Sequence, residues 1–251
     1  MLVKKSILAE IYPPRDKFSF KGRYGKLLVI GGSSLYSGAP ALNALAAYRA
    51  GCDLVTVVAP QRAADIVAGF APDIITHALP GSHIALAHLE TVGAFLNINK
   101  AFVIGGGMDR SKEPLAFVKA FLRHSMLPGV VDADAIHAIV GKLNENVVVT
   151  PHVSEFYVMT GEKLTNDIHE RERKVKGAAK KFHCTIVLKG SVDVISDGKH
   201  VFTNTTGNPY MTVGGTGDTL AGICGALLAR GVEPLKAACA ATYINGAAGD
   251  L

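Results

Sequence analysis

Apolar residues recur along the chain in two alternating patterns. Short, nearly continuous apolar runs rich in β-branched residues predict strands. These runs lie at Lys26–Ile30, Leu54–Val58, Ile74–Ala78, Ala101–Ile104, Val130–Asp132, Val147–Thr150, Thr185–Leu188, Val192–Ser196 and His200–Thr203. Longer stretches with helical spacing predict helices between them, at Pro40–Ala50, His83–Leu96, Pro114–Arg123, Asp167–Phe182, Thr216–Arg230 and Pro234–Gly249.

The alternation of strands and helices predicts a three-layer α/β fold. Several strands are apolar at nearly every position, as expected for a mostly parallel central sheet with helices on both faces. The last strands lie close together around Gly190 and Gly198, which predicts an antiparallel edge hairpin. Since no linker or repeat appears, we expect a single domain over residues 1–251, with a lead-in arm over residues 1–24. The chain stops directly after a helical pattern, as a truncated C-terminus would.

Composition narrows the class of protein. Hydrophobic residues make up 49% of the chain and charged residues 19%, which is ample for a core. The four cysteines lie in apolar segments without a C-x-x-C spacing, which favours free thiols in a reducing, cytoplasmic setting. No signal peptide or run of about 18 apolar residues appears, so we expect no membrane partner. Because the net charge is only +5 and no aromatic-basic pattern appears, we also expect no nucleic-acid partner.

Polar and glycine-rich segments follow several predicted strands, at the sheet edge where α/β proteins bind ligands. The segment Gly31–Ala39 suits an anion at a helix N-terminus or only a tight turn with a cap, and it matches neither a Walker A loop nor a dinucleotide fingerprint. The amides of Gly105–Gly107 could be open to a ligand, or the segment could be only a flexible turn. Further along the chain, this edge receives Asp132, Asp134, His152, Glu155 and Lys189. We expect Asp134 to cap a helix and His152 to be functional. Glu155 could order water around a metal ion. Lys189 could meet phosphate, or Gly190 beside it could only shape the hairpin. The role of Asp132 stays open.

The strongest feature is the segment from Thr206 to Asp218. Its glycines at 214, 215 and 217 expose consecutive amides directly before an apolar helix, which predicts an anion hole at the helix N-terminus. Asp218 lies in the first turn of that helix. It could merely complement the helix dipole, but an acidic side chain in a phosphate site favours a base that accepts a proton from an attacking hydroxyl.

The sequence resembles the ribokinase-like superfamily, which has a Gly-x-Gly-Asp anion hole and a catalytic aspartate. More closely, it resembles the ADP/ATP-dependent NAD(P)H-hydrate dehydratase family, over nearly the whole chain. The motifs that carry the resemblance are Gly32-Ser33-Ser34-Leu35-Tyr36-Ser37-Gly38-Ala39, Asp132-Ala133-Asp134-Ala135, Thr150-Pro151-His152-x-x-Glu155, Val187-Leu188-Lys189-Gly190 and Gly207-Asn208-Pro209-x-Met211-x-x-Gly214-Gly215-Thr216-Gly217-Asp218. The chain departs from the family pattern at Gly106, where the family has proline, and at Tyr210, where it has glycine.

This resemblance implies repair of hydrated NADH and NADPH, by phosphoryl transfer from ADP or ATP to the ring hydroxyl and elimination of phosphate, with Mg²⁺ present. It implies that Asp218 is the catalytic base and that Glu155 acts on the metal through water. It implies that the hydrated dinucleotide contacts Ala39, Gly105, Gly106, Gly107, His152, Asn208 and Asp218. It implies that the adenine nucleotide contacts Lys189, Gly190, Ser191, Val192, Asp193, Gly215, Thr216 and Gly217. Homo-oligomers and pairing with an NAD(P)H-hydrate epimerase also occur in the family.

Two other functions stay open on the sequence alone. One is a small-molecule kinase of the same fold, acting on a vitamin-precursor alcohol. Such kinases share Asp218 and the anion hole but usually have asparagine at the place of His152. The other is a catalytically silent nucleotide-binding module, against which the intact Asp218 argues.

Overall fold

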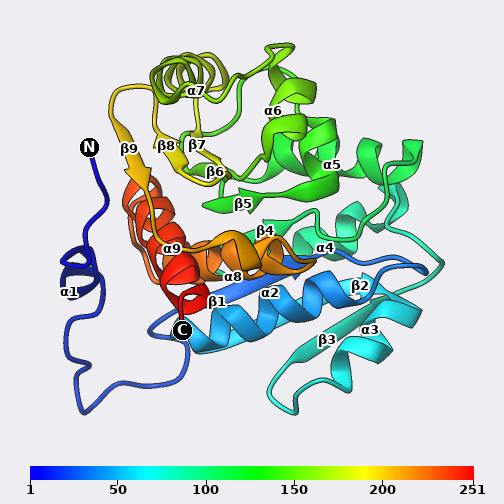
Figure 1. The fold of residues 1–251 in the computed structure, drawn as a ribbon. Coiled ribbons are helices and arrows are strands. Elements are labelled where there is room, and N and C mark those ends of the chain that lie inside the picture. Colours follow the sequence, from blue (N-terminus) through cyan, green and yellow to red (C-terminus); the bar gives the residue numbers. More distant parts are fainter.

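A nine-stranded sheet runs through the computed structural model, which describes residues 1–251 (Figure 1). Its strand order is β3-β2-β1-β4-β5-β6-β7-β8-β9. The strands are β1 (Lys26–Ile30), β2 (Leu54–Pro60), β3 (Ile75–Leu79), β4 (Ala101–Ile104), β5 (Gly129–Val131), β6 (Val147–Val149), β7 (Thr185–Leu188), β8 (Asp193–Ser196) and β9 (Val201–Asn204). In this order, neighbouring strands from β3 through β2, β1, β4, β5 and β6 to β7 are parallel. Strand β8 is antiparallel to both of its neighbours, β7 and β9. The mostly parallel sheet and its edge hairpin are therefore confirmed.

Helices cover both faces of the sheet. One face carries α2 (Gly38–Arg49), α3 (Gln61–Ala68), α8 (Thr216–Ala229) and α9 (Pro234–Gly249). The other carries α4 (Leu89–Leu96), α5 (Lys112–His124), α6 (Val153–Thr160) and α7 (Ile168–Phe182). The remaining helical elements are α1 (Ile7–Ile11) and the short 3₁₀ turns η1 (Leu86–His88), η2 (Ala133–Ala138) and η3 (Pro209–Met211).

The hydrophobic core consists of two clusters, one on each face of the sheet. Alternate residues of a central strand enter different clusters. In β1, Leu27 and Val29 belong to the cluster under α2 and α8, while Leu28 and Ile30 belong to the cluster under α4 and α5. This explains why the strands are apolar at nearly every position.

The prediction of a helix over His83–Leu96 is wrong for the first half of that range. Ala85 is extended, with φ −134° and ψ 167°, and the ring nitrogen Nδ1 of His88 accepts a hydrogen bond from its amide. A 3₁₀ turn follows, and the α-helix begins only at Leu89. The local side-chain bond thus outweighs the helical spacing of the apolar residues.

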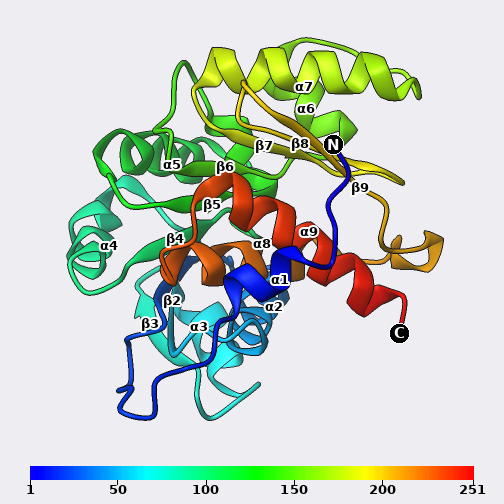
Figure 2. The same ribbon diagram turned by 90° about the vertical axis from the view of Figure 1, so that its left-hand side faces the viewer.

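The N-terminal arm is fixed to the rest of the fold at several points. Its first residues extend the edge of the sheet, since the amide of Val3 donates to the carbonyl of Thr203. Helix α1 lies beside α9 (Figure 2). At the C-terminal end of α1, Arg230 contacts the arm: this C-cap residue of α8 stacks over the ring of Tyr12 and donates to the carbonyl of Ile11.

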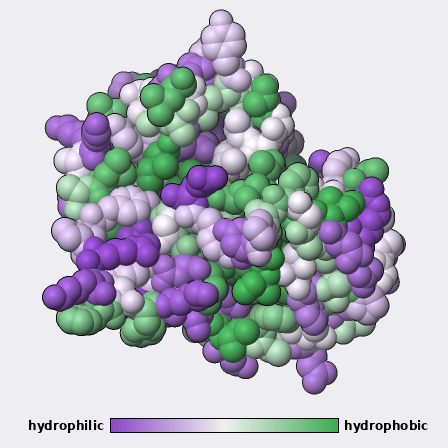
Figure 3. Space-filling view, turned by 90° about the horizontal axis from the view of Figure 1, so that it is seen from below, coloured by the Kyte–Doolittle hydropathy of each residue, from purple (hydrophilic) through white to green (hydrophobic).

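The surface of the fold shows no dominant apolar region on the face seen in Figure 3. Hydrophilic and hydrophobic side chains are interspersed there, over the face that lies below in Figure 1. None of the helices is long and apolar enough to cross a membrane.

The strand order changes direction at β1. From β1 the chain moves outward through β2 to β3, and then returns to place β4 on the other side of β1. The loop after β1 is hydrogen-bonded to the loop after β4, because the amide of Gly32 donates to the carbonyl of Gly106 at 2.8 Å. Such a switch point is where open α/β sheets bind their ligands.

Helices α2 and α8 pack closely over this switch point. A Cβ atom at Gly222 of α8 would lie 2.3 Å from the backbone oxygen of Asn43 in α2, so no side chain fits there. The side chain of Asn43 in turn donates to the backbone oxygen of Asp218 at 2.7 Å. The contact between the two helices therefore sets the position of the first turn of α8.

We predict that Gly222→Ala lowers the free energy of unfolding by about 1–3 kcal/mol, because the added methyl group forces the helices apart. The matched control is Gly177→Ala in α7, where a Cβ atom would meet nothing within 4 Å. That variant should gain about 0.5–1 kcal/mol. Urea unfolding measures both, and equal effects of the two substitutions would contradict the close packing.

Candidate active site

A cavity of about 500 Å³ opens at the carboxyl edge of the sheet. Strand β7 ends there, and the antiparallel hairpin brings the chain back to the same edge at the end of β9. Two segments distant in sequence thus meet around one space. The lining residues are His152, Lys189, Gly190, Ser191, Asp193, Thr206, Gly207, Asn208, Pro209, Met211, Thr212, Thr216, Gly217, Leu220, Thr242, Asn245 and Gly246.

The N-terminus of α8 points at this cavity with its amides uncovered. Gly215 precedes the helix in the left-handed conformation, with φ 103°, and no side chain caps the helix. The hydroxyl of Thr216 donates instead to the carbonyls of Met211 and Val213, which holds the preceding loop. Because the first amides of a helix lack partners within the helix, this arrangement can bind an anionic group.

Asp218 lies in the first turn of α8, against the switch-point loops. A Cβ atom at Gly106 would lie 3.0 Å from the carboxylate oxygen Oδ1 of Asp218 and 2.9 Å from the Cβ of Ala39. A Cβ atom there would require these neighbours to shift slightly. The structure therefore brings together Ala39, Gly106 and Asp218, which the sequence predicts as parts of one site.

The environment of Asp218 raises the pKa of its carboxyl to about 6. Burial is the largest cause, followed by the negative charge of Asp132, while Lys189 acts in the opposite direction. A carboxylate with such a pKa can accept a proton near neutral pH and still be largely ionised there. This is the property expected of a general base.

Lys189, at the end of β7, lies among carboxylates. Its Nζ lies 3.0 Å from Oδ1 of Asp132 and 3.8 Å from Oε2 of Glu155. Burial lowers the pKa of Lys189, but these two carboxylates and that of Asp218 together raise it more, so the pKa lies above its ordinary value. Nζ would also lie 3.4 Å from a Cβ atom at Gly217, which places the ammonium beside the amides of α8.

The two aspartates after β5 differ in role. Asp132 is buried, 3% exposed, and accepts hydrogen bonds from the hydroxyl of Thr150 at 2.7 Å and from Lys189. The prediction that Asp134 caps a helix is wrong, because the N-cap position of η2 falls on Asp132. Asp134 lies inside the first turn and instead accepts from the amide of Asp109 and from Nε of Arg110.

His152 and Glu155 form a reciprocal cap on α6. The ring nitrogen Nδ1 of His152 accepts from the amides of Ser154 and Glu155, and Oε2 of Glu155 accepts from the amide of His152 at 2.8 Å. His152 also lines the cavity, with its side chain half exposed. The histidine thus combines a structural bond at one ring nitrogen with access to the cavity.

No cluster of three or more His, Cys, Asp or Glu side chains could hold a metal ion by itself. Mg²⁺, however, usually keeps several waters and binds through substrate phosphates and one or two carboxylates. Glu155 is buried behind the cavity lining, where its Oε1 atom has a 3.4 Å contact to His152 and its Oε2 atom lies 3.8 Å from Nζ of Lys189. These residues are compatible with an ion that takes most of its ligands from phosphates and water, with at most one or two carboxylates from the protein.

Most residues predicted to contact the adenine nucleotide lie in the cavity wall. Val192 and Gly215 are the exceptions, since they flank the wall without lining it. Asp193 is held by Asn204 and by the amide of Gly190, and burial raises the pKa of its carboxyl.

The residues predicted to contact the hydrated dinucleotide do not all lie together. Gly105, Gly106 and Gly107 lie on the other side of Asp218, away from the cavity lining. Asn208 lines the cavity, but its Nδ2 donates to the carbonyl of Gly249 and to Asp250. Asp218 itself does not line the cavity: it follows Gly217, which does, and its Oδ1 atom lies against Gly106 of the glycine turn.

Sequence reasoning missed several polar residues of this site. Asn43 holds the backbone of Asp218, and Asn245 accepts from the hydroxyl of Thr219 and donates to the carbonyl of Thr216. Both asparagines lie within apolar helical patterns, in α2 and α9. A polar amide on the buried side of such a helix needs a partner, and that is the signal that could have found them.

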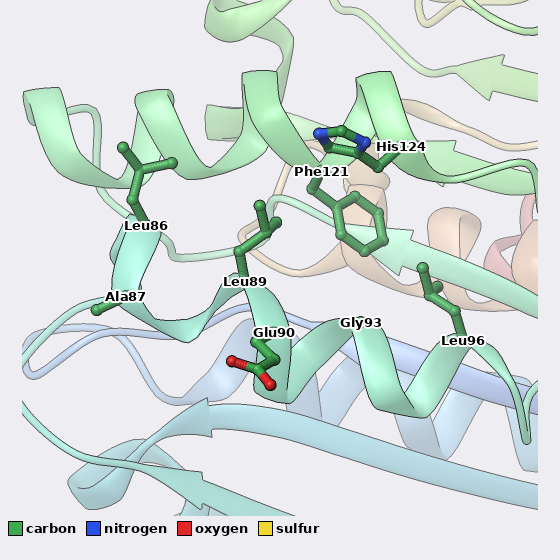
Figure 4. Close-up of a pocket in the computed structure, with 8 residues that line it drawn as sticks. All are labelled: Leu86, Ala87, Leu89, Glu90, Gly93, Leu96, Phe121 and His124. Atoms are coloured by element: carbon green, nitrogen blue, oxygen red, sulfur yellow. The ribbon is translucent and has the colours of Figure 1, made fainter.

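A second cavity lies between α4 and α5, remote from these residues (Figure 4). It measures about 540 Å³ and is lined mainly by apolar side chains such as Leu86, Leu96 and Phe121. Its polar side chains are only Glu90 and His124. Because it contains no lysine or arginine side chain, we place the candidate active site at the strand ends, although the cavity there is slightly smaller.

The fold and the site define a protein of the ribokinase-like class. The structure resembles a ribokinase-like superfamily protein from Enterococcus faecalis, with a TM-score of 0.84 and 26% identity, covering 99% of this chain and 87% of that one. It also resembles the ADP/ATP-dependent NAD(P)H-hydrate dehydratase from Bacillus subtilis, with a TM-score of 0.82 and 26% identity, covering 98% and 87%.

The sequence comparisons give the family. Residues 27–251 match the family model described as NAD(P)H-hydrate dehydratase. The ADP-dependent (S)-NAD(P)H-hydrate dehydratase of Cenarchaeum symbiosum is 37% identical over 99% of this chain and 88% of its own length. The chain belongs to the NAD(P)H-hydrate dehydratase family.

Some relatives are longer. The bifunctional NAD(P)H-hydrate repair enzyme Nnr of Pyrobaculum aerophilum is 41% identical over 92% of this chain, but only 47% of its own length is matched. The chain thus spans about half the length of such bifunctional relatives.

The raised pKa of Asp218 has a consequence for stability. Since its pKa is higher in the folded than in the unfolded chain, Asp218 favours folding at low pH, and this contribution is lost as pH rises through about 6. Asp218→Asn removes the effect. Its free energy of unfolding should therefore rise relative to wild type by about 1–2 kcal/mol between pH 4.5 and pH 8. Denaturant unfolding at both pH values measures this, and a constant difference would contradict the raised pKa.

Proposed function

We propose that this protein is an NAD(P)H-hydrate dehydratase that uses ADP or ATP to repair hydrated NADH and NADPH. The observation that carries the proposal is the position of Asp218, a half-buried carboxylate with a raised pKa, at the open N-terminus of α8. Transfer of a phosphoryl group to a hydroxyl requires a base for the hydroxyl proton and hydrogen-bond donors for the phosphoryl oxygens, and this position provides both.

The reaction begins with removal of a proton. The carboxylate of Asp218 accepts the proton of the ring hydroxyl, and the hydroxyl oxygen attacks the terminal phosphorus of the nucleotide. The bond from that phosphorus to the nucleotide breaks, so that ADP leaves as AMP, or ATP as ADP. Hydroxide is a poor leaving group, and phosphorylation converts it into a good one.

Elimination then restores the reduced ring. The lone pair of the ring nitrogen expels phosphate by breaking the carbon–oxygen bond, and a proton leaves the adjacent ring carbon. During the transfer, the amides at Gly215–Gly217 and the ammonium of Lys189 stabilise the negative charge on the phosphoryl oxygens. When bound, Mg²⁺ would neutralise charge on the phosphates, with Glu155 acting through water.

We infer that the two substrates reach Asp218 from opposite sides. We assign the cavity lined by Lys189, Gly190 and Thr216 to the adenine nucleotide and the glycine-turn side to the hydrated dinucleotide. Support for ADP comes from the archaeal relatives, two of which are named ADP-dependent. The Bacillus subtilis enzyme is named ADP/ATP-dependent and was crystallised with ATP and Mg²⁺, which supports use of ATP.

We further propose that the chain works in the cytoplasm with an NAD(P)H-hydrate epimerase. All four cysteines are buried free thiols, which suits a reducing compartment. The relatives named bifunctional repair enzymes are about twice as long, which supports a second activity that acts alongside this one.

An absorbance assay in the reduced-nicotinamide band tests the proposal. Purified protein receives hydrated NADH, Mg²⁺ and either ADP or ATP. We expect NADH absorbance to recover only when a nucleotide is present, with phosphate released in equal amount. A phosphorylated product that accumulates without recovery would point instead to a small-molecule kinase.

We predict that Asp218→Asn lowers kcat by about 10²–10⁴-fold, the usual contribution of a general base. Nucleotide binding should persist, because the amides of α8 and Lys189 are unchanged. Calorimetric titration with ADP checks the second point. Turnover at the wild-type rate in this variant would remove Asp218 from the role of base.

A further inference from the structure

The turn after Gly107 carries an arginine held in an unusual way. Asp109 adopts the left-handed conformation, with φ 77°, and its carboxylate accepts from the amides of Arg110 and Ser111. The amide of Asp109 donates to Oδ2 of Asp134 at 3.1 Å. A non-glycine residue in this conformation costs energy, so the surrounding hydrogen bonds hold the turn in a defined shape.

Arg110 is fixed through only one of its nitrogens. Its Nε donates to Oδ1 of Asp134 at 2.9 Å, while its two terminal Nη groups make no hydrogen bond. The side chain of Arg110 is 64% exposed, against 17% for that of Asp134. Asp134 therefore fixes the orientation of the guanidinium through Nε, and the N–H donors of the two Nη atoms face solvent.

This arginine stands on the dinucleotide side of Asp218. The turn that carries it begins at Gly107, whose Cβ position would lie 2.8 Å from the Cβ of Tyr36 in the first glycine-rich loop. The charge of Asp134, its anchor, contributes to the raised pKa of Asp218. The other cation of the site, Lys189, lies on the nucleotide side.

Binding of the negatively charged dinucleotide requires positively charged side chains on its side of Asp218. NADH carries a diphosphate, and NADPH carries a further phosphate, whereas this edge of the sheet presents the carboxylates of Asp132, Asp134, Glu155 and Asp218. An arginine fork that binds phosphate oxygens in pairs would offset this repulsion.

We propose that Arg110 binds a phosphate group of the hydrated dinucleotide and sets the affinity for this substrate. The proposal rests on the proposed function, since it takes the dinucleotide as the substrate. Asp134 acts as the positioning residue that orients the guanidinium. Its own bond to Asp109 keeps the turn in shape when Arg110 is replaced.

The test compares Arg110→Ala and Arg110→Lys with Arg123→Ala. Arg123 is an exposed arginine in the last turn of α5, so its removal changes the net charge equally without touching the site. NADH and NADPH serve as binding probes, through the fluorescence of the reduced nicotinamide, and hydrated NADH and NADPH serve as substrates. Equal unfolding midpoints of the variants show that all are folded.

We expect Arg110→Ala to raise the Kd of the probes and the KM of the substrates about tenfold or more, with kcat and the KM for ADP nearly unchanged. Arg110→Lys should lose part of this affinity, since lysine keeps the charge but not the fork. A loss for both NADH and NADPH assigns the contact to the diphosphate, and a loss for NADPH alone assigns it to the additional phosphate.

The opposite results separate the two proposals. If wild type repairs the hydrates but Arg110→Ala behaves as Arg123→Ala does, the role of Arg110 is wrong and the proposed function stands. If wild type neither binds the probes nor repairs the hydrates, the proposed function is wrong and the role of Arg110 falls with it.

Discussion

The site depends on keeping one carboxylate, that of Asp218, partly buried beside an anion hole. A negative charge at the first turn of a helix is favoured by the helix dipole, but burial among other carboxylates opposes it. The outcome is a carboxyl with a pKa of about 6, close to the pH at which a base works best. The close packing of α2 against α8, through Asn43 and Gly222, holds that turn in place.

The carboxylates near Asp218 also position the two positively charged side chains, Lys189 and Arg110. Three carboxylates, those of Asp132, Glu155 and Asp218, surround the ammonium of Lys189, and their charges raise its pKa above the ordinary value. The lysine therefore stays charged beside the amides of α8, where the nucleotide phosphates are expected. On the other side of Asp218, Asp134 orients Arg110 in a comparable way. Each acidic residue near the base thus also positions a group that can meet phosphate.

Much of the fold could be predicted from the sequence, because its strands are buried on both faces. The bounds of β1, β4 and β7 match the prediction, and the other strands differ by one or two residues. Helices α8 and α9 begin as predicted, at Thr216 after the glycines and at Pro234. The prediction failed where a local hydrogen bond decides the backbone, as at Ala85 and His88.

The site could be predicted only as a set of segments. Strand ends and glycine loops indicate which residues reach the ligand edge, but spacing does not show which of them pair. That Lys189 pairs with Asp132, and Arg110 with Asp134, depends on the order β4-β5-β6-β7 of the strands in the sheet. Asn43 escaped the sequence analysis because its partner is a backbone carbonyl 175 residues away.

The central claim is that the substrate hydroxyl, activated by Asp218, attacks the nucleotide. Hydrated NADH prepared in ¹⁸O-water carries the heavy oxygen at the ring hydroxyl, and its repair in ordinary water with ADP reveals where that oxygen goes. Mass spectrometry of the released phosphate is the measurement. The account predicts one ¹⁸O atom in each phosphate. Phosphate without the label, formed while NADH recovers, would show that water attacks the nucleotide and would contradict the account.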